Sequence, residues 1–300
     1  MNRVTTLAPI VLFVYNRLDH TQKTVQALLD NQLADKSTIF IFSDGAKDNK
    51  ERYKVNQVRE YIKTIDGFKK INIINRDKNY GLADSIIDGV TKIISEFDKV
   101  IVLEDDLVSS PFFLKYMNEA LDHFKDIKDV YHISGWNYPF YNDQLGDVFL
   151  WRLMNCWGWA TWADRWSLYK KNTEEIIGEF TSNDIKRFNI DGAEDFWGQI
   201  LANKDGKINT WAIFWYATIY KNGGLCVNPS KSFITNIGHD QSGTHCTRTT
   251  EYLSELCMNK NLDFDIDISE SVAAIEEVKN FYKNNKKNIF QRIINKFKLD

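Results

Sequence analysis

Short apolar segments alternate with amphipathic segments along the first 135 residues, and this alternation constrains the fold more than any other feature of the chain. The apolar segments have the length of strands buried on both faces, and they cover residues 9–15, 37–43, 71–76, 99–103 and 131–134. The segments between them carry apolar residues three and four positions apart, as helices do, over 19–31, 51–65 and 81–97 and from Pro111 onward. This alternation predicts an α/β fold, with a mostly parallel sheet and helices on both of its faces.

The composition is that of an ordinary globular protein, because 43% of the 300 residues are hydrophobic and 26% are charged. The net charge of −3 gives no overall basic field, so we expect no nucleic-acid partner. No apolar run approaches the roughly 18 residues of a membrane span, and Met1–Pro9 lack the features of a signal peptide. We therefore expect a cytoplasmic protein whose four scattered cysteines are reduced thiols.

The second half of the chain has a different character. After Ser134 the strand and helix periodicity weakens, and all nine tryptophans lie within residues 136–215. We expect one catalytic domain over residues 1–260, made of the halves 1–135 and 136–260, and a C-terminal helical tail over 261–300.

Polar residues follow four of the predicted strands at the points where the strands end. These groups are Asn16-Arg17, Ser43-Asp44-Gly45, Asn79-Tyr80-Gly81 and Glu104-Asp105-Asp106. The carboxyl ends of parallel strands meet at one edge of a sheet, and ligands bind beyond that edge. The four groups should therefore converge on one cleft.

The acidic run Glu104-Asp105-Asp106 is the strongest single motif. Three adjacent carboxylates repel one another unless a cation or a hydrogen-bond donor compensates them, and oxygen ligands suit Mg²⁺ or Mn²⁺. Strand alternation would put Glu104 and Asp106 on one face and Asp105 on the other. The alternative is a solvated acidic turn that precedes the helix after Pro111.

Three common nucleotide or hydrolase motifs are absent from the sequence. No GxGxxG follows the first strand, and no GxxxxGK[ST] or GxSxG occurs anywhere. These absences argue against a dinucleotide-dependent oxidoreductase, a P-loop NTPase and an α/β-hydrolase.

A strand ending in YNR, a second ending in SDG, an NxGL turn that opens a helix and an EDD after the fourth strand together resemble a GT-A glycosyltransferase. The chain looks most like bacterial family-2-type sugar transferases, and more distantly like the Golgi N-acetylglucosaminyltransferase that initiates complex N-glycans, which also carries an EDD. The resemblance covers roughly residues 8–246. It implies transfer of a hexosyl or N-acetylhexosaminyl group, with Mn²⁺ or Mg²⁺, from a UDP-sugar to a glycan or lipid-linked acceptor in bacterial surface polysaccharide synthesis.

The resemblance also implies roles on the donor side. Asp44 would hold the uracil ring, Arg17 would approach the diphosphate, Asp105 would lie near the ribose, and Asp106 would bind the metal. Asn79, Gly81 and Glu104 would complete the nucleotide-sugar site. A late histidine near the metal is typical of the family, and His239 and His245 are the candidates, with His239 taken as the second metal ligand.

The catalytic base is less clearly marked. Gly192-Ala193-Glu194-Asp195 resembles the acidic acceptor-side motif of the family, with Asp195 as the base and Glu194 beside it. The alternative is a helix N-terminus, where acidic residues are favourable anyway. In a second registration the Trp-Asp-Asp-Trp run of the Golgi enzyme falls on residues 211–215, which contain no carboxylate.

The run Trp157-Gly158-Trp159 looks like the glycine-containing acceptor loop of the family. Indole faces stack on the apolar faces of sugar rings, so we expect about two or three of the nine tryptophans to face a ligand. The alternative is that the tryptophans are core residues, because large aromatic side chains are usually buried.

The C-terminal segment 286–298 carries apolar residues at helical spacing among five basic ones. Such a helix can lie in an anionic membrane surface as a peripheral contact, or it can dock on the domain through the same apolar stripe.

Two other functions fit the sequence pattern less well. A sugar-phosphate nucleotidyltransferase would need a Gly-rich basic loop after the first strand, and a non-catalytic carbohydrate-binding protein would have no need of the EDD.

Overall fold

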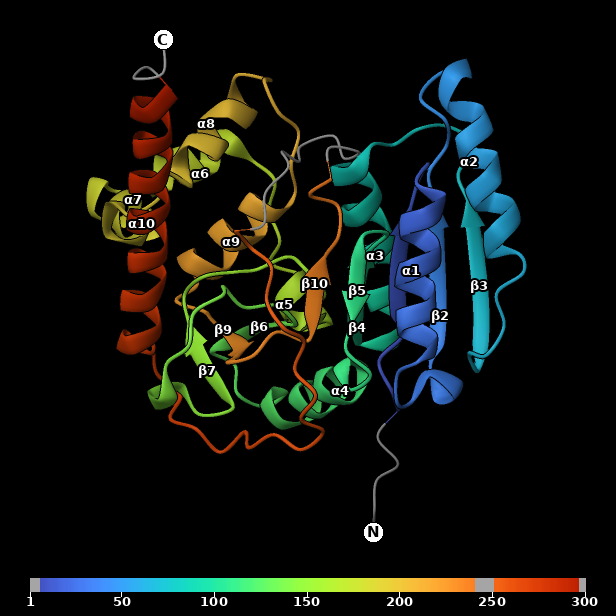
Figure 1. The fold of residues 1–300 in the computed structure, drawn as a ribbon, viewed down its shortest axis with the longest axis horizontal. Helices are drawn as coiled ribbons and strands as arrows, with labels where there is room; N and C mark the ends of the chain where they lie inside the picture. The colour runs from blue at the N-terminus through green and yellow to red at the C-terminus, as the bar shows by residue number, and fades with distance from the viewer. Residues whose placement is uncertain (1–5, 241–250, 297–300) are drawn as a thin grey trace.

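A computed structural model describes residues 6–240 and 251–296 (Figure 1). Eight strands form one sheet: β1 (Ile10–Val14), β2 (Thr38–Ser43), β3 (Lys70–Asn75), β4 (Lys99–Glu104), β6 (Val130–Ser134), β7 (Val148–Trp151), β8 (Trp159–Trp162) and β9 (Leu225–Pro229). Their order across the sheet is β3-β2-β1-β4-β8-β6-β9-β7. Two short strands, β5 (Leu107–Ser109) and β10 (Ile234–Asn236), form a separate antiparallel pair.

Helices flank the sheet, so the α/β class predicted from the sequence is confirmed. They are α1 (Leu18–Leu29), α2 (Asn49–Ile62), α3 (Leu82–Phe97), α4 (Phe113–Phe124), α5 (Ala163–Trp166), α6 (Thr173–Glu179), α7 (Ser182–Phe188), α8 (Trp197–Lys204), α9 (Ala212–Lys221) and α10 (Val272–Lys296). None of the helices in the described ranges is both long and apolar enough to cross a membrane.

The first four predicted strands form the parallel part of the sheet, in the order β3-β2-β1-β4. Every residue of β1 is buried, as its unbroken apolar sequence predicts. The fifth predicted strand, β6, does not pair with β4. Instead β8, from the Trp-rich half, lies antiparallel between β4 and β6, so one sheet runs through both halves of the chain.

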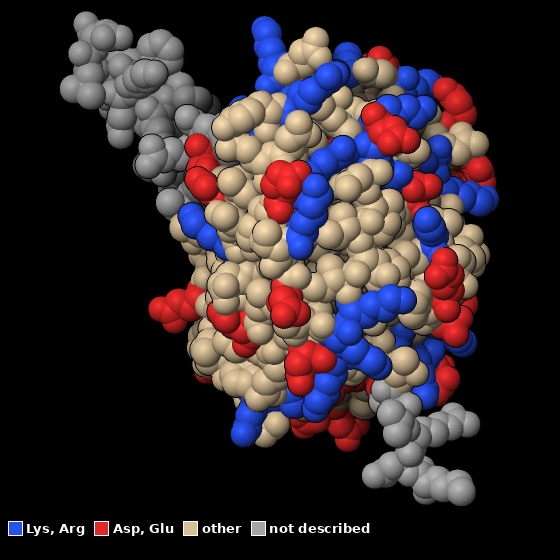
Figure 2. Space-filling model, turned by 90° about the vertical axis from the view of Figure 1, so that its right-hand side faces the viewer, with Lys and Arg blue, Asp and Glu red and all other residues tan. Residues whose placement is uncertain are grey.

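The face of the molecule that carries α2 and the edge strand β3 has acidic and basic side chains interspersed with uncharged ones (Figure 2). Both terminal residues of β3, Lys70 and Asn75, are exposed. A lysine on an edge strand discourages pairing with another chain, because its charge would have to be desolvated.

The tryptophans build the core of the second half. Eight of the nine are buried, and only Trp157 is partly exposed. Trp159 lies in β8 with its ring centroid 5.0 Å from that of Trp211 and 5.5 Å from that of His132. Burial lowers the pKa of His132 to about 3, so this imidazole is neutral within the aromatic layer. Trp157 is thus the one tryptophan with a partly exposed ring, which is fewer than the two or three expected to face a ligand.

The chain after residue 260 begins by packing on the domain. Phe264, Ala274 and Val278 are buried, and the hydroxyl groups of Tyr138 and Tyr282 lie 2.7 Å apart. The first part of α10 is therefore a docked structural helix. The side chains of the predicted basic segment, residues 286–298, lie outside the described ones.

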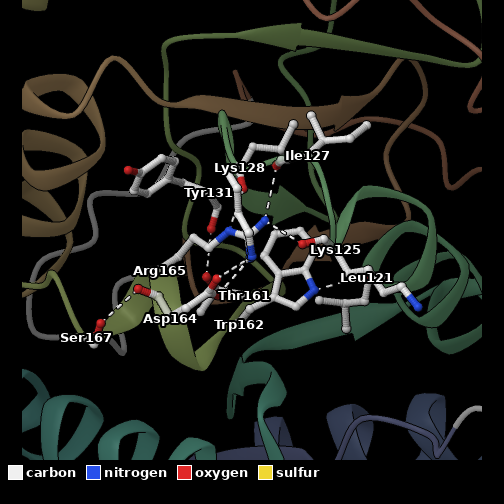
Figure 3. A network of polar contacts seen from close by, with 11 residues as sticks. Leu121, Lys125, Ile127, Lys128, Tyr131, Thr161, Trp162, Asp164, Arg165 and Ser167 are labelled. Carbon is white, nitrogen blue, oxygen red and sulfur yellow. Dashed lines mark hydrogen bonds and ion pairs between the residues drawn. The ribbon is translucent and has the colours of Figure 1, made fainter.

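Arg165, in the short helix α5, holds the loop between α4 and β6 in place through hydrogen bonds (Figure 3). Arg165 is 3% exposed, and its guanidinium donates to three backbone carbonyls, those of Lys125 (2.8 Å), Ile127 (3.1 Å) and Val130 (3.2 Å). It also donates to both carboxylate oxygens of Asp164, at 2.7 and 2.8 Å, and stacks on the Trp162 ring. All five donors of one side chain are thus used to hold a loop.

We expect Arg165→Lys to lower the free energy of unfolding by about 3 kcal/mol, because an ammonium group cannot reach the same acceptors from one planar fork. Lys128→Ala is the matched control, since Lys128 only makes an exposed 2.7 Å ion pair with the same Asp164. The control should change stability by about 0.5 kcal/mol or less. Urea unfolding of the two variants measures both effects, and equal losses would contradict the role given to Arg165.

Candidate active site at the carboxyl edge of the sheet

The acidic run lies at the carboxyl end of β4 and is buried. Asp105 and Asp106 are 4% and 6% exposed, which differs from the solvated turn of the alternative interpretation. One nitrogen of Arg17, Nη2, contacts a carboxylate oxygen of Asp105 and lies 2.9 Å from Oδ2 of Asp106. The prediction that Asp105 and Asp106 face opposite ways is wrong, because β4 ends at Glu104 and the following turn brings both carboxylates to one guanidinium.

The cluster carries more negative charge than Arg17 compensates. Burial raises the pKa of Glu104 to about 8, and the neighbouring charges of Asp106 and Asp105 add to this effect. Burial also raises the pKa of Asp105, against the opposing effect of Arg17. Three acidic groups share one guanidinium, so the site favours an additional cation or a proton.

The β5–β10 pair brings a segment from late in the chain onto this cluster. The amide of Ile237 donates to the carbonyl of Asp106 at 2.9 Å. A Cβ at Gly238 would lie 2.1 Å from Oδ2 of Asp106 and 3.1 Å from Nη1 of Arg17, so only glycine fits there. His239 follows directly, and both of its ring nitrogens are buried without a hydrogen-bond partner in the described structure. His245, the other candidate histidine, lies outside the described residues.

These residues fit a divalent cation that the donor would help to hold. Among the residues that the structure describes, no group of three or more His, Cys, Asp or Glu side chains forms a complete metal site. Mg²⁺ sites at nucleotides commonly use one or two protein ligands and complete the shell with phosphates and water. Asp106 and His239 supply the oxygen and nitrogen that such a site needs, and the unpartnered imidazole is consistent with a missing partner.

A second cluster is centred on Asp44, directly after β2. Its buried carboxylate accepts hydrogen bonds from the amides of Gly45 and Tyr80 at 2.9 Å and of Gly81 at 3.0 Å, and from the Asn79 side chain at 3.1 Å. These donors fill its acceptor positions, so a uracil imide would have to displace one of them. The strand-end groups do lie at one edge of the sheet, but they form two clusters. In the second cluster the carboxylate of Asp44 is already hydrogen-bonded to its neighbours Gly45, Asn79, Tyr80 and Gly81.

Gly45 packs closely against the backbone of Lys78, so the absence of its side chain does not leave room for a ligand. A Cβ there would lie 2.4 Å from the backbone carbon of Lys78. The ring of Tyr80, 38% exposed, lies over the Arg76 guanidinium at 4.0 Å and supplies an open aromatic surface beside Asp44. Arg76 was not among the site residues expected from the sequence. The sequence marks it only as a basic residue at the end of a predicted strand.

The acidic acceptor-side motif has two carboxylates in different surroundings. Asp195 is exposed, and its Oδ1 accepts from the Gly198 amide at 2.9 Å and from Asn189 at 3.3 Å, so it caps the start of α8. The charge of Glu194 acts on Tyr252, whose ring borders that of Trp157. Burial raises the pKa of Tyr252, and the charges of Glu251 and Glu194 raise it further. The helix-terminus interpretation therefore describes Asp195, while Glu194 acts on Tyr252 through its charge.

Trp157 is the tryptophan that borders the site. Its ring centroid lies 5.3 Å from that of His239, 5.8 Å from that of Tyr252 and 4.6 Å from that of Trp136. Gly158 has φ of +61°, and a Cβ there would lie 2.7 Å from Ile234, so this glycine lets the loop pack on β10. The residues of the second registration, Trp211–Trp215, begin α9 in the core.

His20 adds a contact that sequence reasoning also missed. Its Nε2 lies 3.2 Å from Oδ2 of Asp240, so α1 is tied to the residue that follows His239. Nothing in the helical pattern of α1 marks this histidine, because its partner comes from the other half of the chain.

Comparison with solved structures finds several chains at low similarity. S. aureus TarS 1-349 matches at 9% identity with a TM-score of 0.42, over 75% of this chain and 59% of that one. A mannosyltransferase from Pyrobaculum calidifontis, in complex with GDP-Man and Mn²⁺, matches at 10% identity with a TM-score of 0.37, over 73% and 70%. The chain spans only 24% of a longer TarS structure.

A search among curated proteins found no significant match. A sequence model of the GNT-I family, by contrast, matches residues 1–167 of the 300. The matched region contains β1 to β8, and with them the whole acidic cluster, Arg17 and the Trp157 loop. The chain therefore belongs to the GNT-I family, which is a family of glycosyltransferases.

Proposed function

We propose that this protein transfers a sugar from a nucleotide-sugar donor, most simply a UDP-sugar, to a glycan or lipid-linked acceptor. The reaction uses Mn²⁺ or Mg²⁺, and bacterial surface polysaccharide synthesis is the setting that the sequence resemblance suggests. The observation that carries the proposal is the buried acidic cluster after β4, where both Arg17 and the Gly238-His239 segment lie against Asp106.

The donor side follows from these positions. Asp106 and His239 would hold the cation, which would supply positive charge beside the leaving nucleoside diphosphate. Arg17 meets the phosphates through Nη1, a buried nitrogen that has no partner in the described structure. Asp105 and Glu104 lie beside it toward the ribose. Asp44 contributes indirectly. It accepts hydrogen bonds from the turn of Asn79, Tyr80 and Gly81, and the outer surface of this turn contacts the nucleoside.

The acceptor side supports Glu194 as the base. A base must reach the acceptor hydroxyl, and a sugar ring stacks on an aromatic face. The charge of Glu194 acts on Tyr252, whose ring centroid lies 5.8 Å from that of Trp157, the one partly exposed tryptophan. Asp195, the base expected from the sequence, instead accepts a hydrogen bond from the Gly198 amide and so caps α8. We therefore assign the base to Glu194 and the cap to Asp195.

The metal assignment is tested with Asp106→Asn, which removes one charge and keeps the size of the side chain. Wild-type protein with UDP and Mn²⁺ at about one hundred times the dissociation constant should gain about 2.7 kcal/mol of stability. Asp106→Asn should lose the Mn²⁺-dependent part of this gain in a thermal-shift assay. Asp205→Asn, an exposed acid paired with Lys207, is the control and should behave as wild type. An unchanged Mn²⁺ dependence in Asp106→Asn would reject the metal site.

The base assignment is tested with variants that remove the charge of Glu194 or Asp195 separately from the helix cap that Asp195 provides. Glu194→Gln should lower the transfer rate by about a hundredfold or more at saturating donor, without weakening UDP binding. Asp195→Asn should transfer nearly normally, since Asn is also a good cap, whereas Asp195→Ala should lose about 1 kcal/mol of stability. If Asp195→Asn abolishes transfer and Glu194→Gln does not, Asp195 is the base. If both transfer normally, the chain works without a carboxylate base from this motif.

We also propose that the C-terminal basic segment contacts an anionic membrane surface. The docked residues of α10, through Tyr282, precede this segment, so removing residues 286–300 should leave the fold intact. Sedimentation with vesicles rich in an anionic lipid should fall at least severalfold on truncation, because roughly 1 kcal/mol is lost per basic residue near the surface. Vesicles of zwitterionic lipid are the control. A truncated protein that unfolds, or that binds anionic vesicles as before, would reject the proposal.

A further inference from the structure

Arg17 stands where a cation of the acidic cluster would stand. It follows β1 and immediately precedes α1, and its Nη2 bridges Asp105 and Asp106. The oxygen of Asp106 that it contacts, Oδ2, is also the oxygen against which Gly238 packs. A metal ion that reaches Asp106 from the His239 side therefore meets the guanidinium at the same carboxylate.

We propose that Arg17 is the resident cation of the site in the donor-free protein, and that it gives up Asp106 to the metal ion when the donor arrives. The inference rests on the proposed function, because it requires a metal and a diphosphate at this site. In the exchange Arg17 changes from a counter-ion of Asp106 to a ligand of the diphosphate, and the metal ion replaces it as the cation beside Asp106.

The buried charges of the cluster favour keeping a cation beside Asp106 at every stage. Three carboxylates, those of Glu104, Asp105 and Asp106, lie at the end of one buried strand, and Arg17 is the cation that contacts the two aspartates in the described structure. Buried carboxylates are tolerated only when they are paired or protonated. A metal added while Arg17 still bridges both aspartates would place two cations at one carboxylate, and their repulsion would weaken metal binding.

The surroundings of Arg17 prepare it for a phosphate. Its second terminal nitrogen, Nη1, is buried and has no partner in the described structure. The N-cap residue of α1 is Arg17 itself, whose side chain does not cap the first-turn amides, and uncapped amides at a helix N-terminus favour an anion. A diphosphate placed there would take Nη1 and the helix amides together, and would draw the guanidinium away from Asp106.

The exchange predicts that metal and nucleotide bind cooperatively. Metal alone competes with Arg17 for Asp106, whereas UDP removes that competitor and adds phosphate oxygens to the metal shell. Reciprocity requires that Mn²⁺ strengthen UDP binding by the same factor as UDP strengthens Mn²⁺ binding.

Arg17→Gln separates this role from a merely structural one, because it should change two affinities in opposite directions. Without nucleotide, the variant should bind Mn²⁺ about tenfold more tightly than wild type, measured as free Mn²⁺ by electron paramagnetic resonance. With Mn²⁺ present, it should bind UDP about tenfold or more weakly, measured by calorimetry. A variant that is simply misfolded would lose both affinities.

Arg17→Lys and Arg187→Gln complete the experiment. Arg17→Lys keeps the charge but not the fork that bridges two carboxylates, so it should bind Mn²⁺ alone with an affinity between those of wild type and Arg17→Gln. Arg187→Gln, an exposed arginine paired with Glu270, should match wild type in both measurements. Unchanged or weaker Mn²⁺ binding by both folded Arg17 variants, with normal Mn²⁺ and UDP binding by wild type, would overturn the exchange alone. Failure of wild type to bind Mn²⁺ even with UDP would instead overturn the proposed function.

Discussion

Three backbone pairs between β5 and β10 hold the two parts of the candidate site together. Their register joins Ile234 to Ser109, Thr235 to Val108 and Asn236 to Leu107. Because β5 begins directly after Asp106, the same register puts the next residues of the late segment onto the Asp106 carbonyl and carboxylate. The position of His239 relative to the acidic cluster is therefore set by main-chain geometry, which varies less than side-chain packing does.

The acidic cluster in turn depends on the rigidity of the sheet beneath it. Every residue of β1 and most residues of β2 and β4 are buried, so the carboxyl ends of these strands are held in place by the core. Arg17 leaves β1 and Asp106 follows β4, the neighbouring strand, which brings guanidinium and carboxylate within reach without a long loop. Asp44 holds its own turn at the end of β2 in the same way, so that two polar clusters stand side by side on one apolar scaffold.

The sequence allowed the parallel part of the sheet to be predicted almost completely, since an unbroken apolar run as short as that of β1 is typical of a strand covered on both faces. Its helices and the position of Asp106 at a strand end followed from the same pattern. The rest could not be predicted for physical reasons. A three-residue strand such as β5 has no periodicity to detect, and β8 was hidden in a Trp-rich run that also suits a ligand loop. The hydrogen bonds that occupy Asp44, and the contact of Arg17 with both aspartates, arise only from tertiary placement.

The insertion of β8 between β4 and β6 has a consequence for how the chain folds during synthesis. Until Trp162 has left the ribosome, β4 has only β1 as a neighbour, and its other edge offers unpaired amides and carbonyls. The parallel half can form first, because it is synthesised first, but the free edge of β4 then stays unpaired through the synthesis of α4 and β6. A nascent chain that stalls in this interval is exposed to aggregation, so the first half should depend on chaperones until β8 closes the sheet.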